Sequence, residues 1–292
     1  MLFQDWLKDE AKIILFDGAM GTELIKRGLK PGKVPDLLNI EQPEIISEIH
    51  KSYYDAGSEM CQTNTFGSTP MNLKRHNLED RVEEIIENAL KNIKKVRPSG
   101  CLIVGDIGPT GEFRPPVGKA NSEQWYSSFS TQTKLLEKGV DLWHIETISD
   151  LEEMLAAIKA VRDISKKPLI ASLTYKKTKR GFFTIMGDSL EKCIETLNNE
   201  KVDVIGANCT LGSKDMLELL KNARNLTDKP ISVKPNAGQP IIKGDKTYYE
   251  QPIENFVNDA REMIEFGAKI VGGCCGTSPK TIMEISKIIN GI

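Results

Sequence analysis

Long apolar runs are missing from this sequence, and so is an excess of charge of one sign. No stretch approaches the roughly 20 apolar residues of a membrane-spanning helix, and the N-terminus lacks the basic and then apolar pattern of a secretory signal. The formal charge of -2 creates no field that would attract nucleic acid or an anionic membrane. We therefore expect a cytoplasmic protein that binds neither.

Linkers and low-complexity segments are also missing from the 292 residues. The composition, 39% hydrophobic and 27% charged, is ordinary for a soluble enzyme. An α/β barrel routinely reaches this length as one domain. We expect a single domain over residues 1–292, in which residues 1–12 form an N-terminal helical extension.

Histidine is scarce, and the 3 histidines form no metal-ligand pattern. The 6 cysteines are not expected to form a disulfide framework in the cytoplasm. Three of them, Cys61, Cys101 and Cys193, lie within predicted strands or a predicted helix, so we expect them to be structural.

Short apolar segments alternate with helical patterns along the whole chain. Strands that are buried on both faces have this apolar character, and eight strand–helix units predict a (β/α)8 TIM barrel. A doubly wound open sheet is the alternative, but it usually carries a glycine-rich phosphate loop that this sequence lacks. The predicted strands are 13–16, 59–63, 101–104, 141–145, 169–174, 203–207, 231–234 and 269–273, and the main helices are 43–54, 78–96, 122–138, 150–164, 189–198, 213–225, 253–266 and 279–289.

The other three cysteines stand at the ends of predicted barrel strands. Cys209 ends the sixth strand, and Cys274 and Cys275 end the eighth. The carboxyl ends of barrel strands surround one mouth, so these sulfurs can converge, whereas neighbouring cysteines are a poor disulfide pair. Three thiolates with an open position are typical of a catalytic zinc site, and Asn236, which ends the seventh strand, could add an oxygen. The alternative is three buried structural cysteines.

Two acids, Asp17 and Glu146, end the first and fourth predicted strands. Carboxylates at a barrel mouth suit the capture of a substrate ammonium group, although either could instead bond backbone amides. The backbone amides of Gly18 and Ala19 could bind a substrate carboxylate.

Thr63 ends the second predicted strand, Asn64 follows it, and Thr147 follows Glu146 after the fourth. They could orient the substrate or the groups that hold it. Capping of the turns is the alternative for these short polar side chains.

Together these motifs resemble those of the homocysteine S-methyltransferase family. The resemblance runs from about residue 10 to the C-terminus. Within the family, the chain is most similar to the N-terminal homocysteine-binding module of cobalamin-dependent methionine synthase. The matching segments are DGAMGT at 17–22, TNTF at 63–66, GDIGP at 105–109, NC at 208–209, PNAG at 235–238 and GCCG at 273–276.

The resemblance implies a zinc-dependent enzyme that methylates homocysteine to methionine. It implies that Cys209, Cys274 and Cys275 are the zinc ligands through which catalysis acts. Asn236 would fill the fourth zinc position when homocysteine is absent.

The resemblance also implies substrate contacts. Asp17 and Glu146 would hold the amino group of homocysteine, and the amides near Gly18 and Ala19 its carboxylate. The expected methyl donor is methylcobalamin, supplied by a corrinoid-carrying partner domain or protein.

Three alternatives stay open. The chain could be a stand-alone methyltransferase that uses the sulfonium S-methylmethionine, with Phe113, Trp125, Tyr126 or Phe182 around the cation. It could be a non-catalytic zinc-binding or thiol-binding module. A different barrel enzyme, such as a phosphate-binding aldolase or isomerase, is the third; Lys234 could mimic a Schiff-base lysine, but the cysteine pair argues against this class.

Overall fold

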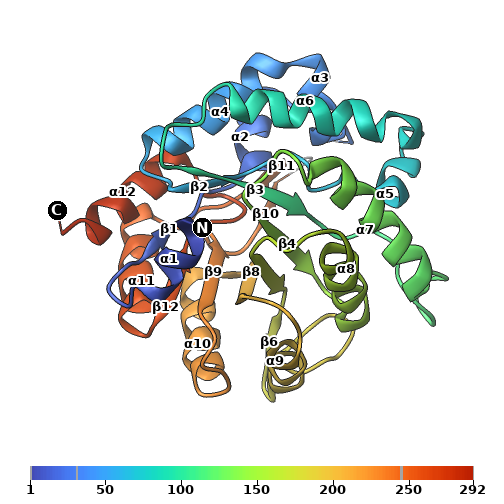
Figure 1. The fold of residues 1–292 in the computed structure, drawn as a ribbon. Helices are drawn as coiled ribbons and strands as arrows, with labels where there is room; N and C mark the ends of the chain where they lie inside the picture. Colours follow the sequence, from blue (N-terminus) through green and yellow to red (C-terminus); the bar gives the residue numbers. More distant parts are fainter. Residues whose placement is uncertain (1, 31, 244–245, 292) are drawn as a thin grey trace.

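Eight short parallel strands form the centre of the computed structural model, which describes residues 2–30, 32–243 and 246–291 (Figure 1). Their order in the sheet is β1-β12-β9-β8-β5-β4-β3-β2, and a parallel bridge between Phe16 and Met60 joins the two ends. This arrangement confirms the predicted TIM barrel. The strands are β1 Ile14–Leu15, β2 Met60–Gln62, β3 Leu102–Ile107, β4 Leu142–Ile148, β5 Leu169–Leu173, β8 Val204–Gly212, β9 Ile231–Asn236 and β12 Ala268–Val271.

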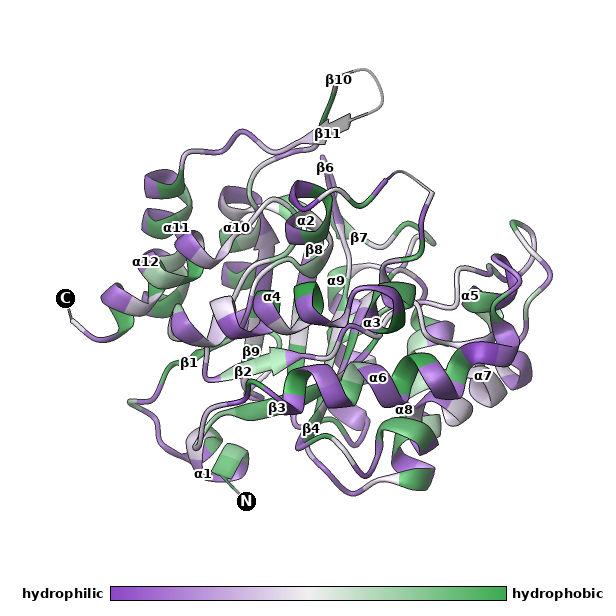
Figure 2. Cartoon of the chain, turned by 90° about the horizontal axis from the view of Figure 1, so that it is seen from above, coloured by the Kyte–Doolittle hydropathy of each residue, from purple (hydrophilic) through white to green (hydrophobic). Residues whose placement is uncertain are grey.

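Amphipathic helices surround the barrel, and Figure 2 shows them with apolar and polar stripes. Their apolar stripes pack on the outer faces of the strands. Proline begins α4 and α12, and capping boxes at Asn121 and Ser278 begin α7 and α12. The helices are α4 Pro43–Asp55, α6 Val82–Lys94, α7 Ser122–Leu136, α8 Leu151–Ile164, α9 Leu190–Asn199, α10 Ser213–Arg224, α11 Ile253–Glu265 and α12 Pro279–Ile289.

The predicted N-terminal extension is a shorter helix than expected. Helix α1 spans Leu2–Lys8, and Met1 lies outside the described residues. Phe3 is buried among the apolar residues inside the barrel, with Trp6 and Leu7 beside it. The extension therefore contributes to the core.

Inward-facing residues change character along the strands. Because side chains alternate between two faces, every second residue of a strand points into the barrel. One part of the interior is apolar, and polar residues follow it toward the carboxyl ends of the strands. The apolar set is Ile14, Phe16, Met60, Leu102, Val104, Leu142, Ile170, Val204 and Ile270; the polar set is Gln62, Asp106, His144, Glu146, Ser172, Asn208, Lys234 and Asn236.

Several elements were not predicted. Two antiparallel hairpins follow barrel strands, and Figure 2 shows the second of them projecting from the body. The predicted helix 78–96 begins later, because a 3-10 turn, Glu79–Arg81, precedes α6. No helix in the described ranges is long and apolar enough to cross a membrane. The added elements are β6 Lys176–Thr178, β7 Gly181–Phe183, β10 Ile241–Lys243, β11 Lys246–Tyr248, α2 Met20–Lys26, α3 Leu38–Glu41, α5 Pro70–Lys74 and the 3-10 turn Pro35–Leu37.

Candidate metal centre

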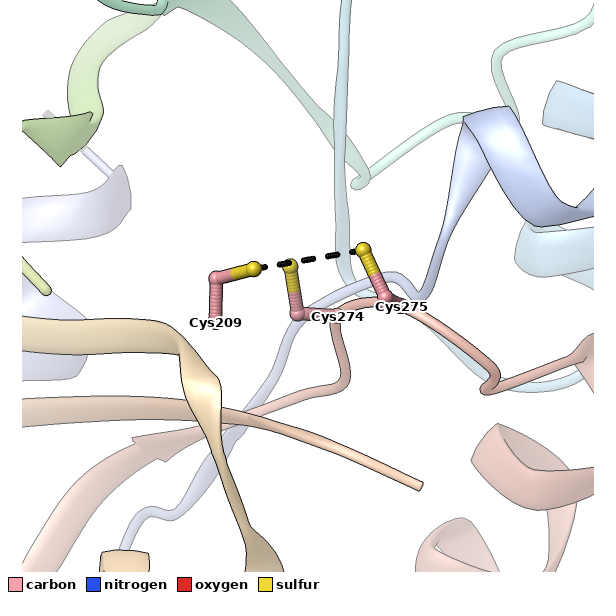
Figure 3. Close-up of side chains that lie close together, drawn as sticks. All are labelled: Cys209, Cys274 and Cys275. Atoms are coloured by element: carbon pink, nitrogen blue, oxygen red, sulfur yellow. Dashed lines mark hydrogen bonds between the residues drawn. The ribbon is translucent and has the colours of Figure 1, made fainter. Parts of the chain in front are cut away.

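Three cysteine sulfurs gather at the mouth of the barrel. The Sγ atoms of Cys209, Cys274 and Cys275 all lie within 4.8 Å of one another, and those of Cys209 and Cys275 are 3.9 Å apart. Figure 3 shows the three side chains extending toward one region, Cys209 from β8 and the other two from the segment after β12. The predicted convergence of the sulfurs is therefore present in the fold.

Unusual backbone geometry turns Cys209 toward its partners. Cys209 and Thr210 have φ values of 58° and 53°, which lie in the left-handed region that side chains other than glycine rarely adopt. The register between β8 and β9 shifts between Asn208 and Gly212, at the same place. A bulge of this kind re-aims a side chain next to a site.

Backbone hydrogen bonds hold the cysteine pair in place. The Cys274 amide donates to the Pro235 carbonyl at 2.8 Å, and the Cys275 carbonyl accepts from the Ala237 amide at 2.9 Å. The pair is thereby fixed on both sides to the end of β9, the strand between the two cysteine-bearing strands.

The three thiols shift one another's pKa values strongly. Hydrogen bonds from Cys209 and Cys274 lower the pKa of Cys275 to about 3. Contacts with Cys209 and Cys275, together with burial, raise the pKa of Cys274 well above its ordinary value. The pKa of Cys209 is raised to about 12, so the three thiols together favour a single negative charge, on Cys275.

The donor set fits a tetrahedral zinc ion. Sulfurs about 2.3 Å from such an ion would stand about 3.8 Å from one another, close to the 3.9 Å between Cys209 and Cys275. Asn236 lies on β9 between the two cysteine strands and is 2% exposed. Its Oδ1 is buried without a hydrogen-bond partner among the described residues, so an oxygen donor is free there.

The other cysteines lie apart from this cluster. Cys61 and Cys193 are fully buried, and burial raises the pKa of both thiols. Cys101 is partly buried and points its sulfur at the Ser58 carbonyl. These positions agree with the structural role expected for all three.

Asp17 forms a buried ion pair. Its Oδ1 is 2.7 Å from the Lys234 ammonium, and its Oδ2 accepts from the Gln62 backbone amide at 2.7 Å. Burial works against the charge on Lys234, but the carboxylates of Asp17 and Glu146 outweigh it and raise the Lys234 pKa. The Schiff-base alternative has little support, since a lysine of this kind must lose its proton to act.

Glu146 lies in a network of neutral donors. Its Oε1 accepts from Gln62 Nε2 at 2.7 Å, and its Oε2 accepts from Asn208 Nδ2. Asp106 lies near, and burial followed by the charge of Glu146 raises the Asp106 pKa well above its ordinary value. Burial raises the pKa of Glu146 too, but Lys234 and the Gln62 hydrogen bond oppose that shift, so we assign the proton to Asp106 and the negative charge to Glu146.

The polar loop residues bond within the protein. The Thr63 hydroxyl bonds the Thr65 hydroxyl at 2.7 Å and accepts from the Asp106 amide at 3.1 Å. The Asn64 side chain donates to the Pro35 carbonyl at 3.0 Å. These bonds fit the turn-capping alternative, and a substrate contact by either residue stays a prediction.

Thr147 contacts Asn208, the residue that precedes Cys209. Its backbone amide donates to Asn208 Oδ1 at 2.8 Å, and its hydroxyl lies 2.8 Å from Asn208 Nδ2. Its φ of 59° is again left-handed, and the register between β4 and β5 shifts there.

The Gly18–Ala19 turn packs against the segment after the cysteine pair. The Ala19 amide donates to the Thr277 hydroxyl at 3.2 Å. A Cβ at Gly18 would lie 2.8 Å from Thr277 Oγ1 and 2.9 Å from Tyr53 Cε1, so only glycine fits. Binding of a carboxylate by these amides stays a prediction.

Two of the four aromatic residues proposed for a sulfonium ligand are wrongly placed for it. Trp125 is completely buried and donates its indole N–H to the Glu112 carbonyl, and Phe182 is 3% exposed. The Tyr126 hydroxyl is bonded to Asp163 of α8. Both buried rings belong to the packing between helices and hairpin, which a sequence pattern could not distinguish from a ligand pocket.

Sequence reasoning gave no role to Gln62, Asn208 or Tyr249, and considered Lys234 only as a residue that could mimic a Schiff-base lysine. Gln62, Asn208 and Lys234 are polar residues at inward positions of barrel strands, which is the pattern that could have marked them. Tyr249 follows a hairpin strand, and its hydrogen bond helps to lower the pKa of Cys275. No local pattern marks such a loop residue.

Comparison with known proteins adds to this geometry. A family model described as homocysteine S-methyltransferase matches residues 14–289. The chain is 28% identical over 302 residues to methionine synthase of Mycobacterium tuberculosis, covering 96% of this chain and 25% of that protein. It is also 28% identical over 299 residues to methionine synthase of Mycobacterium leprae, covering 95% of this chain and 24% of that protein. The chain thus spans about a quarter of the length of these curated relatives.

Among solved structures, the metallated form of the homocysteine methyltransferase MmuM from Escherichia coli has a similar fold. Its TM-score is 0.82 at 23% sequence identity, and the match covers 99% of this chain and 100% of that one. The two chains therefore share a fold over their whole compared lengths.

Proposed function

Because the chain belongs to the homocysteine S-methyltransferase family, we propose that it binds zinc through Cys209, Cys274 and Cys275 and methylates homocysteine to methionine. The observation that carries this proposal is the cluster of three sulfurs at the barrel mouth. Residues 1–292 would act as one unit, with residues 1–12 as its extension.

Zinc at the cluster would lower the pKa of the substrate thiol and keep its sulfur in the nucleophilic thiolate form. The chain's own part is to hold the three sulfurs in place before the metal arrives. The β8 bulge does this for Cys209, and the bonds to β9 do it for Cys274 and Cys275. Asn236 would occupy the remaining position until the substrate sulfur takes it, since its Oδ1 has no other partner in the described ranges.

The rest of the substrate would be held beside the sulfurs. Glu146 would accept the ammonium group, because it is an acid at the mouth linked through Asn208 to the Cys274 sulfur, 3.9 Å from Asn208 Nδ2. The amides of Gly18 and Ala19 would bind the carboxylate, and Thr147 would keep Glu146 in place. Thr63, Asn64 and Asp17 are further predicted contacts. Fixing the amino acid in this way keeps its sulfur aligned for attack on a methyl group.

We propose methylcobalamin, on a corrinoid-carrying domain or protein, as the donor. The support is similarity to methionine synthases that are about four times as long as this chain. The alternative is a stand-alone enzyme with a sulfonium donor such as S-methylmethionine, favoured by the full-length match to a homocysteine methyltransferase. Trp125 and Phe182, two of the four aromatic residues suggested to surround a sulfonium cation, are buried, which weakens this alternative.

The experiment measures methylation of homocysteine by the zinc-loaded, reduced protein, with methylcobalamin and S-methylmethionine supplied as donors in parallel reactions. Turnover with methylcobalamin supports the first donor, and turnover with S-methylmethionine alone supports the alternative. Cys209→Ala should abolish both zinc binding and turnover. Homocysteine binding without methyl transfer to either donor would favour the non-catalytic module. The cytoplasmic location remains a proposal, supported by 6 free cysteines.

A further inference from the structure

A short segment after the second hairpin returns to the cysteine cluster. The Gln251 amide donates to the Ala237 carbonyl at 3.3 Å, and the Ala237 amide donates to the Cys275 carbonyl at 2.9 Å. The Gln251 side chain also donates to the Ser213 hydroxyl at the start of α10. Residues 249–251 are therefore attached to the end of β9 and to α10, the helix that follows β8.

Tyr249 lies against the turn that follows Cys275. The residue is half-buried and packs on the main core. A Cβ at Gly276 would stand 2.5 Å from Tyr249 Cγ and 3.0 Å from Ala237 Cβ, so any larger residue there would push the tyrosine away. The glycine therefore lets the tyrosine side chain approach the neighbour of Cys275 closely.

The Tyr249 hydroxyl bonds to the Cys275 sulfur. Burial, followed by the charge of Cys275, raises the pKa of Tyr249 above its ordinary value. The phenol therefore keeps its proton, and its O–H group donates to the sulfur. A hydrogen bond to a charged sulfur belongs to the stronger, charge-assisted kind.

The other two sulfurs of the cluster receive hydrogen bonds from β8. Asn208 Nδ2 lies 3.9 Å from the Cys274 sulfur, and the Thr210 backbone amide donates to the Cys209 sulfur. Cys275 differs, because its side-chain donor comes from a residue outside the barrel strands.

Such a bond matters because the sulfurs of the cluster compete with the substrate sulfur for the methyl group. A donor that reaches the mouth can also methylate Cys275. That transfer forms a sulfur–carbon bond, breaks the bond between the methyl group and its carrier, and leaves the electron pair of the broken bond on the carrier. The resulting thioether is uncharged, so Cys275 would be lost as a ligand, since the thiolate is the form that binds metal.

We propose that Tyr249 protects Cys275 from methylation, so that the methyl group goes to the substrate sulfur. Its O–H group takes up part of the negative charge on the Cys275 sulfur, and a sulfur of lower basicity is a weaker nucleophile. Tyr249 is thus a positioning residue that acts through Cys275. This inference rests on the proposed function.

The test uses methyl iodide, a small methyl donor that needs no binding site. The zinc-loaded, reduced protein is treated with it in the absence of homocysteine, and peptide mass spectrometry follows methylation of each cysteine. Y249F should raise the rate at Cys275 about three- to tenfold, because roughly half of a charged hydrogen bond is lost as the sulfur gives up its charge. The rate at Cys209 should stay the same, and zinc release, measured with a dye, should accelerate together with methylation of Cys275.

The matched control is Y126F. It removes a tyrosine hydroxyl that bonds Asp163 at an exposed position, and it should leave all the rates unaltered. Equal rates at Cys275 in Y249F and in the unmodified protein would overturn the inference. An equal rise at Cys209, Cys274 and Cys275 with a lower Tm would also overturn it, since that pattern reports a loosened fold. Y249M, which likewise lacks a donor, replaces Y249F if that variant does not fold.

The two proposals fail in different ways. An unmodified protein that does not bind zinc at the cluster, or does not methylate homocysteine, contradicts the proposed function, and the inference with it. A zinc-loaded, active enzyme whose rate at Cys275 is unchanged in Y249F contradicts only the role of Tyr249.

Discussion

The side-chain oxygen of Asn208 accepts the backbone amide of Thr147 at 2.8 Å, and this bond links left-handed Thr147 to the residue that precedes left-handed Cys209. Thr147 has a φ of 59°, and Cys209, the neighbour of Asn208, has a φ of 58°. Asn208 also donates to Glu146. One buried amide therefore links the strand that carries the proposed ammonium contact to the strand that carries a proposed zinc ligand.

Asn208→Ala should loosen both strands. The Thr147 amide and Glu146 would lose a buried partner, which costs about 1–3 kcal/mol of stability. We expect zinc affinity to fall about 10–100-fold, as is usual when a group that supports a ligand is lost. Competition with a zinc-binding dye measures this. Asn225→Ala, in an exposed position, is the control; equal zinc affinity in both variants would argue against a supporting role.

Cys209→Ser should leave the barrel folded but without tightly bound zinc. Binding at 1,000 times the dissociation constant stabilises the native state by about 4 kcal/mol, so a chelator should lower the Tm of the unmodified protein toward that of the variant. The chelator should not change the Tm of the variant. Cys193→Ala is the matched control, because it removes a buried thiol of α9 and should keep zinc. Equal zinc content in Cys209→Ser and Cys193→Ala would contradict the assignment of ligands.

Gly18→Ala should damage the turn that follows β1. The added Cβ would lie 2.8 Å from Thr277 Oγ1, and relief of such crowding costs about 1–3 kcal/mol. We expect a lower Tm and a higher KM for homocysteine. Gly21→Ala, three residues on, is the control: no atom lies within 4 Å of its added Cβ, and it stands in helix α2, where alanine is favoured by up to about 1 kcal/mol. Similar Tm and KM values for the two variants would refute this view of the turn.

Stability should depend on pH through Glu153. Burial raises the pKa of this acid to about 7, although the Thr110 amide and hydroxyl bond its carboxylate. An unfolded glutamate titrates near pH 4.3, so between about pH 4 and 7 the native state retains a proton that the unfolded state releases. The free energy of unfolding therefore falls as pH rises through this window, by up to about 3 kcal/mol, and is level above it.

Glu153→Gln should remove that part of the pH dependence and stabilise the protein at pH 8. Urea unfolding of the variant and of the unmodified protein at several pH values gives the difference in their free energies of unfolding as a function of pH. Exposed Glu48 provides the control substitution, Glu48→Gln, which should leave the slope as it is. An unaltered slope in Glu153→Gln would show that another group titrates in this range.

The barrel could be predicted from the sequence because its pattern repeats. Each strand is a short apolar run between helical periodicities, and each predicted strand overlaps a barrel strand, although β4 and β8 extend to Ile148 and Gly212, beyond their predicted ends. The hairpins β6–β7 and β10–β11 were not predicted, since each of their strands has only three residues, too few for a strand pattern to be recognised.

The cysteine cluster was predictable for the same reason. Residues at the carboxyl ends of barrel strands must meet, so the positions of Cys209 and Cys275 follow from the topology. The partner of a charged side chain does not follow from it. Asp17 pairs with Lys234, 217 residues away, and only the closed barrel brings the two together.

The central claim is that the three cysteines hold a zinc ion that takes the substrate sulfur. Zinc X-ray absorption on the loaded, reduced protein, recorded before and after saturation with homocysteine, tests it most directly. We predict three sulfur neighbours and one oxygen or nitrogen before, and four sulfur neighbours after. A first shell that is unchanged at a homocysteine concentration that supports binding or turnover would contradict the claim.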